Sequence, residues 1–193
     1  MSGLPDRVEL NGVPYFRGKA NHSGAMALAA LLRQQGIEIT PGLLDKPLHL
    51  PDQVDQLQSS TQRVAREYGM MVYPLETSMR AVLAQVAAGY PVLVRYTDGA
   101  AFWSEPRYAV LVGYDRFKDS VLLRAADERR KIMSFSSFEA KWRDAGGWAV
   151  LIQNPVQLPA AVDRQRWLQA ADELAKAGQE REAAKAVRAL NSQ

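Results

Sequence analysis

Few residues of this chain could carry out chemistry. The 193 residues include no cysteine and only two histidines, His22 and His49. Without cysteine the chain has no thiol nucleophile, no disulfide and no thiolate metal site. Ser23 is the candidate nucleophile, and a serine hydroxyl needs a neighbouring base to react. His22 is adjacent along the chain but diverges from Ser23 at a helix start, and His49 reaches Ser23 only if the fold brings it there.

We expect no metal or cofactor site. A metal site would need carboxylates around one or both histidines, and the His-Glu-x-x-His spacing of zinc proteases is absent. The 24 basic and 21 acidic residues nearly balance, and no Lys/Arg run with interleaved aromatics indicates a nucleic-acid partner. No stretch approaches the roughly 20 apolar residues of a transmembrane segment.

Ser23 begins the most distinctive apolar segment. Residues 23–35 predict a helix, and Gly36 after it is the usual residue of a left-handed C-terminal cap. Residues 25–32 are apolar on every face, which is typical of a helix buried in a core. In the plainest interpretation, Ser23 is simply the N-cap of this helix.

The remaining pattern places helices in the first half and strands in the second. Further helices are expected at 40–46, 52–68 and 77–88, with a short strand at 71–73 and an extended segment at 8–16. Apolar, β-branched runs predict strands at 91–96, 108–114, 120–124, 131–135 and 148–153. A capping box from Ser136 to Glu139 opens one more helix. Helices followed by an antiparallel sheet make an α+β fold.

Two more helices are predicted at the C-terminus, at 163–177 and 179–190. This hairpin resembles one tetratricopeptide repeat, with its Trp-x-x-x-Ala spacing and trailing small residues. A single repeat cannot bury its own apolar face. The hairpin therefore either packs back on the main domain or forms a dock for a partner. The expected organisation is a domain at 1–155 and the helical hairpin at 160–193.

The N-terminal segments carry a motif of known type. Val13-Pro14-Tyr15-Phe16 and, further on, His22-Ser23-Gly24-Ala25-Met26-Ala27-Leu28 resemble the start of the C39-like peptidases, a papain-like family that includes double-glycine leader peptidases. In that family the nucleophile starts a buried helix, whose dipole and N–H groups lower a thiol's pKa and hold the oxyanion. Residues 87–94 and 108–115 resemble later strands of the family, and the tail resembles the repeat of a bacterial branch. The resemblance implies a papain-like fold over roughly residues 8–190.

The resemblance fails at the catalytic positions. Ser23 stands in place of the cysteine, Arg107 in place of the histidine, and Ala125 near the third catalytic position. The oxyanion glutamine falls at Arg17 or Gly18. Arginine cannot accept a proton at ordinary pH, and loss of a triad's nucleophile or base costs on the order of 10⁶ in rate. The resemblance therefore predicts a natural pseudoenzyme.

A cleft without catalysis could recognise charge. Arg107 could offer its planar fork to a carboxylate, next to His22 and Ser23 at a helix start whose N–H groups attract anions. An equal alternative is that Arg107 is only a solvated strand end. The family fold places Tyr96 and Trp103 in a loop beside the cleft, where they line a peptide groove or form a small core of the loop.

The favoured function is non-catalytic binding of a peptide or protein partner. Two alternatives stay open, a hydrolase that uses Ser23 and a scaffold that works through the C-terminal hairpin. The resemblance implies an exported, cell-envelope setting, because members of this branch are usually lipoproteins, although the chain shows no leader or lipobox. The sequence names neither the ligand nor the oligomeric state.

Overall fold

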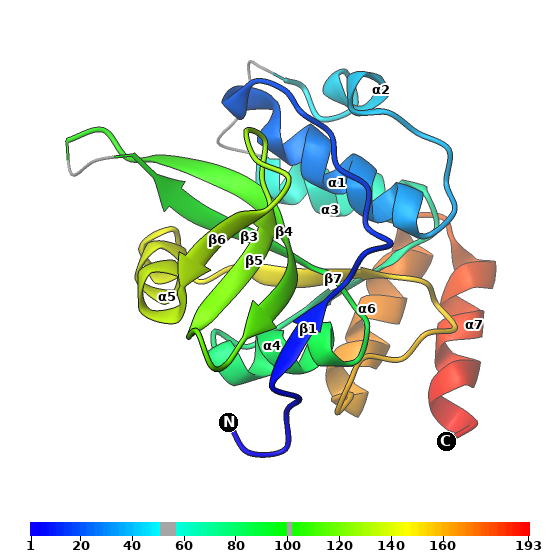
Figure 1. The fold of residues 1–193 in the computed structure, drawn as a ribbon. Helices are drawn as coiled ribbons and strands as arrows, with labels where there is room; N and C mark the ends of the chain where they lie inside the picture. The colour runs from blue at the N-terminus through cyan, green and yellow to red at the C-terminus, as the bar shows by residue number, and fades with distance from the viewer. Residues whose placement is uncertain (51–56, 100–101) are drawn as a thin grey trace.

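A computed structural model describes residues 1–50, 57–99 and 102–193, and it shows an antiparallel sheet with helices on both faces (Figure 1). The strands are β1 (Arg7–Glu9), β2 (Met71–Pro74), β3 (Val92–Asp98), β4 (Glu105–Asp115), β5 (Ser120–Arg124), β6 (Lys131–Ser134) and β7 (Ala149–Gln153). The helices are the 3-10 turn η1 (Ala20–His22), α1 (Ser23–Gln34), α2 (Pro41–Asp45), α3 (Leu57–Glu67), α4 (Met79–Ala87), α5 (Phe135–Asp144), α6 (Arg164–Lys176) and α7 (Glu180–Asn191).

The sheet is built around β4. Six strands follow the order β2-β7-β3-β4-β5-β6, and β1 pairs with the end of β4. β3 pairs with β4 over the β4 residues Glu105, the first of that strand, to Leu111. β5 pairs with β4 only from Val110 onward. Among the described residues, the first residues of β4 therefore have no strand neighbour on the β5 side.

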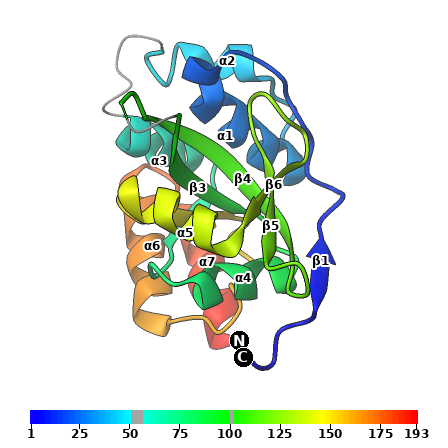
Figure 2. The same cartoon turned by 60° about the vertical axis from the view of Figure 1, so that its left-hand side comes forward.

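Helices cover both faces of the sheet (Figure 2), and a hydrophobic core lies between the sheet and the helices on each face. Successive side chains of a strand point to opposite faces, so Tyr108 and Val110 pack with α1, α2 and α3, whereas Ala109 and Leu111 pack with α4, α5 and α6. Helix α1 is buried along most of its length, from Ser23 to Leu32. The prediction of a buried central helix in an α+β fold is confirmed.

Several predicted boundaries were wrong. Of the extended segment expected at 8–16, only Val8 and Glu9 belong to a strand, β1, and residues 10–19 form no helix or strand. Helix α5 begins two residues earlier than predicted, because its N-cap is Ser134 and not Ser136; Ser134 Oγ accepts a hydrogen bond from the Ser137 amide at 3.1 Å. The helix predicted at 52–68 is present from Leu57 to Glu67, while residues 51–56 lie outside the described residues.

The C-terminal helices α6 and α7 share the core of the sheet. Trp167 is fully buried, its ring lies 6.0 Å from that of Tyr73 of β2, and its indole N–H donates to Ala186 O at 2.9 Å. Gln85 of α4 exchanges two hydrogen bonds with the backbone of Ala160, just before α6. The apolar faces of the two helices are therefore covered by the rest of the chain. Over the described residues, no helix is long and apolar enough to cross a membrane.

Candidate functional site

Ser23 is the first residue of α1, and its hydroxyl is buried against β4. Its Oγ accepts a hydrogen bond from the Tyr108 amide at 3.0 Å, and the residue is 5% exposed. The Tyr108 amide is available because β5 reaches β4 only at Val110. The serine thus replaces a strand partner at this point of β4.

The interpretation of Ser23 as an N-cap was wrong. His22 occupies the N-cap position of α1 and makes no side-chain capping bond, so the Ser23 side chain is free to bond β4 instead. The Ser23 amide donates to Ala20 O within the preceding 3-10 turn. That amide is consequently not available to an anion at the start of the helix.

Neither histidine is bonded to the Ser23 hydroxyl. The Nδ1 atom of His22 lies 3.0 Å from Asp45 Oδ1, so the ring is held against α2. His49 is exposed and has a positive φ of 56° in the chain that follows α2. The hydrogen bonds of the described residues give Ser23 no general base.

Arg107 directly precedes Tyr108, whose amide bonds Ser23, but the guanidinium of Arg107 binds other groups. Its Nη2 donates to Glu105 Oε2 at 2.7 Å, and its Nη1 donates to Pro106 O at 3.2 Å. Its Nε is buried and has no partner among the described residues. The position of the family's histidine thus holds a cation that is paired within its own strand.

The segment predicted to carry the glutamine is hydrogen-bonded to the residues that follow the third catalytic position. Gly18 N donates to Ala126 O at 3.2 Å, and Arg17 Nη2 donates to Asp127 O at 3.2 Å. Ala125 is buried and bonds within its own turn, with its amide on Glu128 O. A Cβ on Gly18 would lie 2.7 Å from Met26 Sδ, so a glutamine at this position would have to displace that side chain. Gly18 supplies no side-chain donor for an oxyanion, and the Arg17 guanidinium is bonded to the Asp127 carbonyl.

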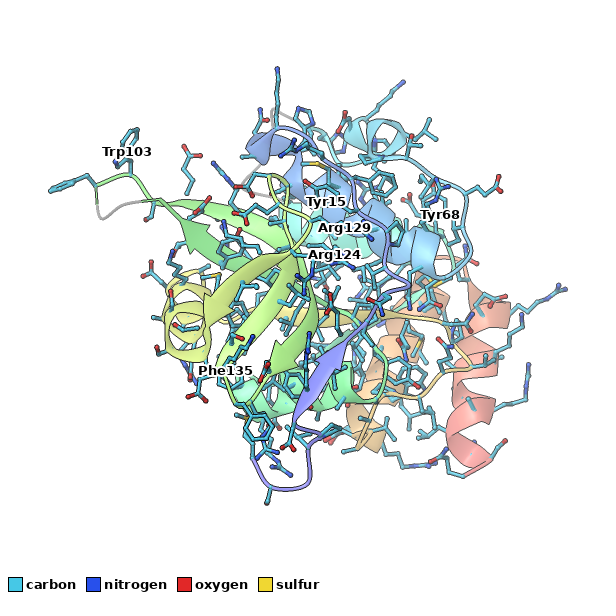
Figure 3. All side chains as sticks on the ribbon, viewed as in Figure 1. Tyr15, Tyr68, Trp103, Arg124, Arg129 and Phe135 are labelled. Atoms are coloured by element: carbon cyan, nitrogen blue, oxygen red, sulfur yellow. The ribbon has the colours of Figure 1, made fainter. Side chains whose placement is uncertain are left out.

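A small pocket lies beside Ser23, and the sequence reasoning missed the charged side chain that lines it. Tyr15 and Arg124 both line it (Figure 3). Arg124 is 5% exposed and donates to three backbone carbonyls, those of Leu10, Val13 and Arg129. Burial lowers the pKa of Arg124. An arginine that ends the apolar run of β5 was the available signal.

The two aromatic residues predicted to line a peptide groove lie in different environments. Tyr96 is 2% exposed, and burial raises the pKa of its hydroxyl well above the ordinary value, so this ring belongs to the core. Trp103 is 78% exposed and its neighbour Phe102 is 96% exposed. Trp103 lies at the outer end of the β3–β4 hairpin, away from the body of the domain (Figure 3). Neither Phe102 nor Trp103 forms a core within the loop.

A groove on this hairpin brings two of the predicted site residues together. Arg107 and Trp103 line an open hollow with Asp98, Gly99 and Glu105. Ser23 lines the separate small pocket, and His22 lies against α2. No cluster of three potential metal ligands of the His, Cys, Asp or Glu type occurs in the described part of the chain.

Known structures share this architecture. A C39-like peptidase from Bacillus anthracis has 17% identity and a TM-score of 0.61, over 76% of this chain and 97% of its own. The peptidase domain of Streptococcus ComA, a bifunctional ABC transporter of a quorum-sensing pathway, has 16% identity and a TM-score of 0.57, over 74% and 99%. A double glycine motif protease from an AMS/PCAT transporter, solved in complex with the leader peptide, has 14% identity and a TM-score of 0.53, over 75% and 92%.

The chain has the papain-like fold of the C39 peptidases. These identities show the fold alone. No protein-family model and no curated protein matches the sequence. The fold of the resemblance is therefore confirmed, and the function has to be argued from the residues of the site.

Proposed function

We propose that this protein binds a peptide in a C39-type fold without hydrolysing it. The observation that carries the proposal is the hydrogen bond from the Tyr108 amide to Ser23 Oγ. The hydroxyl at the nucleophile position serves as a buried acceptor within the scaffold. A serine nucleophile would need a base within hydrogen-bond reach. The neighbouring cation, Arg107, cannot act as that base.

Peptide binding is supported by the fold and by the β3–β4 hairpin. One protein of similar fold was solved with a leader peptide bound. In this chain, the hairpin exposes Trp103 next to the charged side chains of Arg107 and Glu105 in one groove. Large exposed aromatic residues beside polar groups are typical of surfaces that bind partners. We assign the peptide to this groove.

The two alternative functions have less support. A hydrolase using Ser23 would need His22 to leave Asp45 and turn toward the start of β4. A scaffold acting through α6 and α7 would need their apolar face to be free, yet Trp167, Ala171 and Leu174 are buried in the core of the sheet. Neither arrangement fits the contacts of the described residues.

A paired assay of cleavage and binding tests the proposal. The purified full chain is incubated with peptides that contain a Gly-Gly site, and the products are followed by mass spectrometry. Binding of the same peptides is followed by two-dimensional amide NMR. We expect chemical-shift changes without cleavage. Turnover that disappears in Ser23→Ala would overturn the proposal, and so would the absence of any binding at millimolar peptide.

A further inference from the structure

Two carboxylates face each other across the β3–β4 hairpin. Asp98 and Glu105 are register partners, so their side chains lie directly opposite on one face of the ribbon. Like charges in this arrangement destabilise a strand pair. Arg107 compensates Glu105 through the contact of 2.7 Å. Among the described residues, Asp98 Oδ1 accepts a hydrogen bond from the Gly99 amide at 3.0 Å, and no basic side chain there pairs with Asp98. Within this part of the chain, one negative charge in the groove is therefore left without a paired cation.

The exposed residue Trp103 lines the same groove as Asp98. Gly99 has a φ of +107°, and a Cβ there would lie 2.7 Å from Trp103 O. Only glycine allows the two backbone segments to approach so closely. The backbone that carries the exposed Trp103 indole is therefore positioned by the hairpin. The face of an indole attracts cations.

The groove does not favour an anion. The guanidinium of Arg107 already holds a carboxylate, that of Glu105, and an incoming carboxylate would have to displace it. This reverses the sign expected from the sequence, in which Arg107 was the ligand-binding charge. A metal ion is also disfavoured, because no third carboxylate or histidine joins Asp98 and Glu105 among the described residues.

We propose that this groove binds the side chain of a lysine or arginine from an extended partner peptide. The inference rests on the proposed peptide-binding function and specifies its ligand. The cationic group lies between Asp98 and Glu105 and against the face of Trp103. Asp98 supplies the uncompensated charge, and Trp103 supplies both the aromatic face and apolar contact for the methylene chain.

Matched peptides test the charge preference. The probes are capped hexapeptides, Ala-Val-Xaa-Val-Gly-Gly, in which Xaa is lysine, glutamate or norleucine. The readout is the indole N–H resonance of Trp103 in the full chain, assigned with Trp103→Phe. We expect the lysine peptide to bind about three- to fivefold more tightly than the other two, the range of an exposed ion pair. Asp98→Asn should remove this preference, while Glu180→Gln, at an exposed carboxylate on α7, should keep it.

A second variant checks the role of Arg107. Glu105→Gln releases the guanidinium from its partner, so we expect the preference to move toward the glutamate peptide. This variant alters an exposed side chain and leaves the backbone pairing of the hairpin intact, so a failure to fold does not obscure the result.

The outcomes separate the two proposals. Equal binding of all three peptides at Trp103 overturns the charge preference and leaves peptide binding standing. Binding at other resonances alone also overturns the groove assignment. A Trp103 shift produced by calcium chloride without peptide points to a metal, and one that follows protein concentration points to a second copy; either result overturns the inference. Cleavage of the lysine peptide would overturn the proposed function but not the preference.

Discussion

The Ser23 hydroxyl accepts a hydrogen bond of 3.0 Å from the Tyr108 amide, and this bond joins the first residue of α1 to β4. The two residues are 85 positions apart in the sequence. Ser23→Ala would leave the Tyr108 amide without an acceptor in a buried place. An unsatisfied buried donor costs about 1–3 kcal/mol, so we expect the free energy of unfolding in urea to fall by that amount.

The control for this change is Ser136→Ala, at an exposed serine on α5, which should leave the urea midpoint unchanged. If Ser23→Ala is as stable as the natural chain, the hydrogen bond contributes nothing to the free energy of unfolding. The hydroxyl would then be available for another role.

Restoring the two family residues should not restore a peptidase. In Ser23→Cys combined with Arg107→His, the third position remains Ala125 and the glutamine position remains Arg17 or Gly18. We expect no cleavage of Gly-Gly peptides by mass spectrometry, because Ala125 cannot orient a histidine and neither Arg17 nor Gly18 replaces the amide of the glutamine. Cleavage by this double variant would show that the site is only two substitutions away from activity.

The C-terminal helices should be required for folding. Trp167→Ala removes a fully buried indole and its bond to Ala186 O. Substitutions of this kind cost about 3–5 kcal/mol, a large part of the stability of a typical domain. We expect a strongly lowered melting temperature by circular dichroism.

Truncation after Pro159 should give an aggregating chain for the same reason, whereas Arg181→Ala on the exposed surface of α7 should behave normally. A truncated chain that folds and melts cooperatively would contradict the shared core and revive an independent role for the hairpin.

Alkaline pH should destabilise the fold through two buried tyrosines. Burial raises the pKa of Tyr108 to about 12. The pKa of Tyr96 is also raised, mainly by burial and to a smaller extent by the negative charge of Asp98. Tyrosine in an unfolded chain loses its proton near pH 10, at about its reference pKa. The folded state therefore retains protons that the unfolded chain releases. Its extra stability is complete below about pH 10 and is lost as the pH rises toward 12.

Urea unfolding at a series of pH values checks this direction. Tyr96→Phe should make the alkaline loss of stability shallower, and Tyr68→Phe, at an exposed ring, should not. A loss of the same steepness in Tyr96→Phe would assign the effect to other groups.

The sequence allowed the fold to be predicted wherever a local pattern decided the structure. The all-apolar run of α1 predicted burial in the core, and the short apolar runs of β5 and β7 predicted strands. The start of β4 was predicted three residues late, because Glu105 and Pro106 carry no strand signal. A proline is tolerated there because β5 does not pair with that part of β4, so no ladder bond is lost.

The site was less predictable because its contacts join distant segments. The partner of Ser23 depends on where β5 begins to pair with β4, which no local pattern reveals. The exposure of Trp103 depends on how far the hairpin extends beyond the rest of the sheet. In contrast, the pairing of Arg107 with Glu105 follows from their positions two apart on one strand face, and could have been inferred once β4 was extended to Glu105.

The N-terminal residues depend on parts of the chain that are made much later. Val8 pairs with Tyr114, and Val13 O accepts from Arg124, so neither bond can form until more than half of the chain exists. During synthesis, α1 can collapse early with its apolar neighbours, but the residues before it have to wait for β4 and β5. Long-range pairing of this kind slows folding. During synthesis, residues 7–13 should therefore take their place only after β4 and β5 have been made.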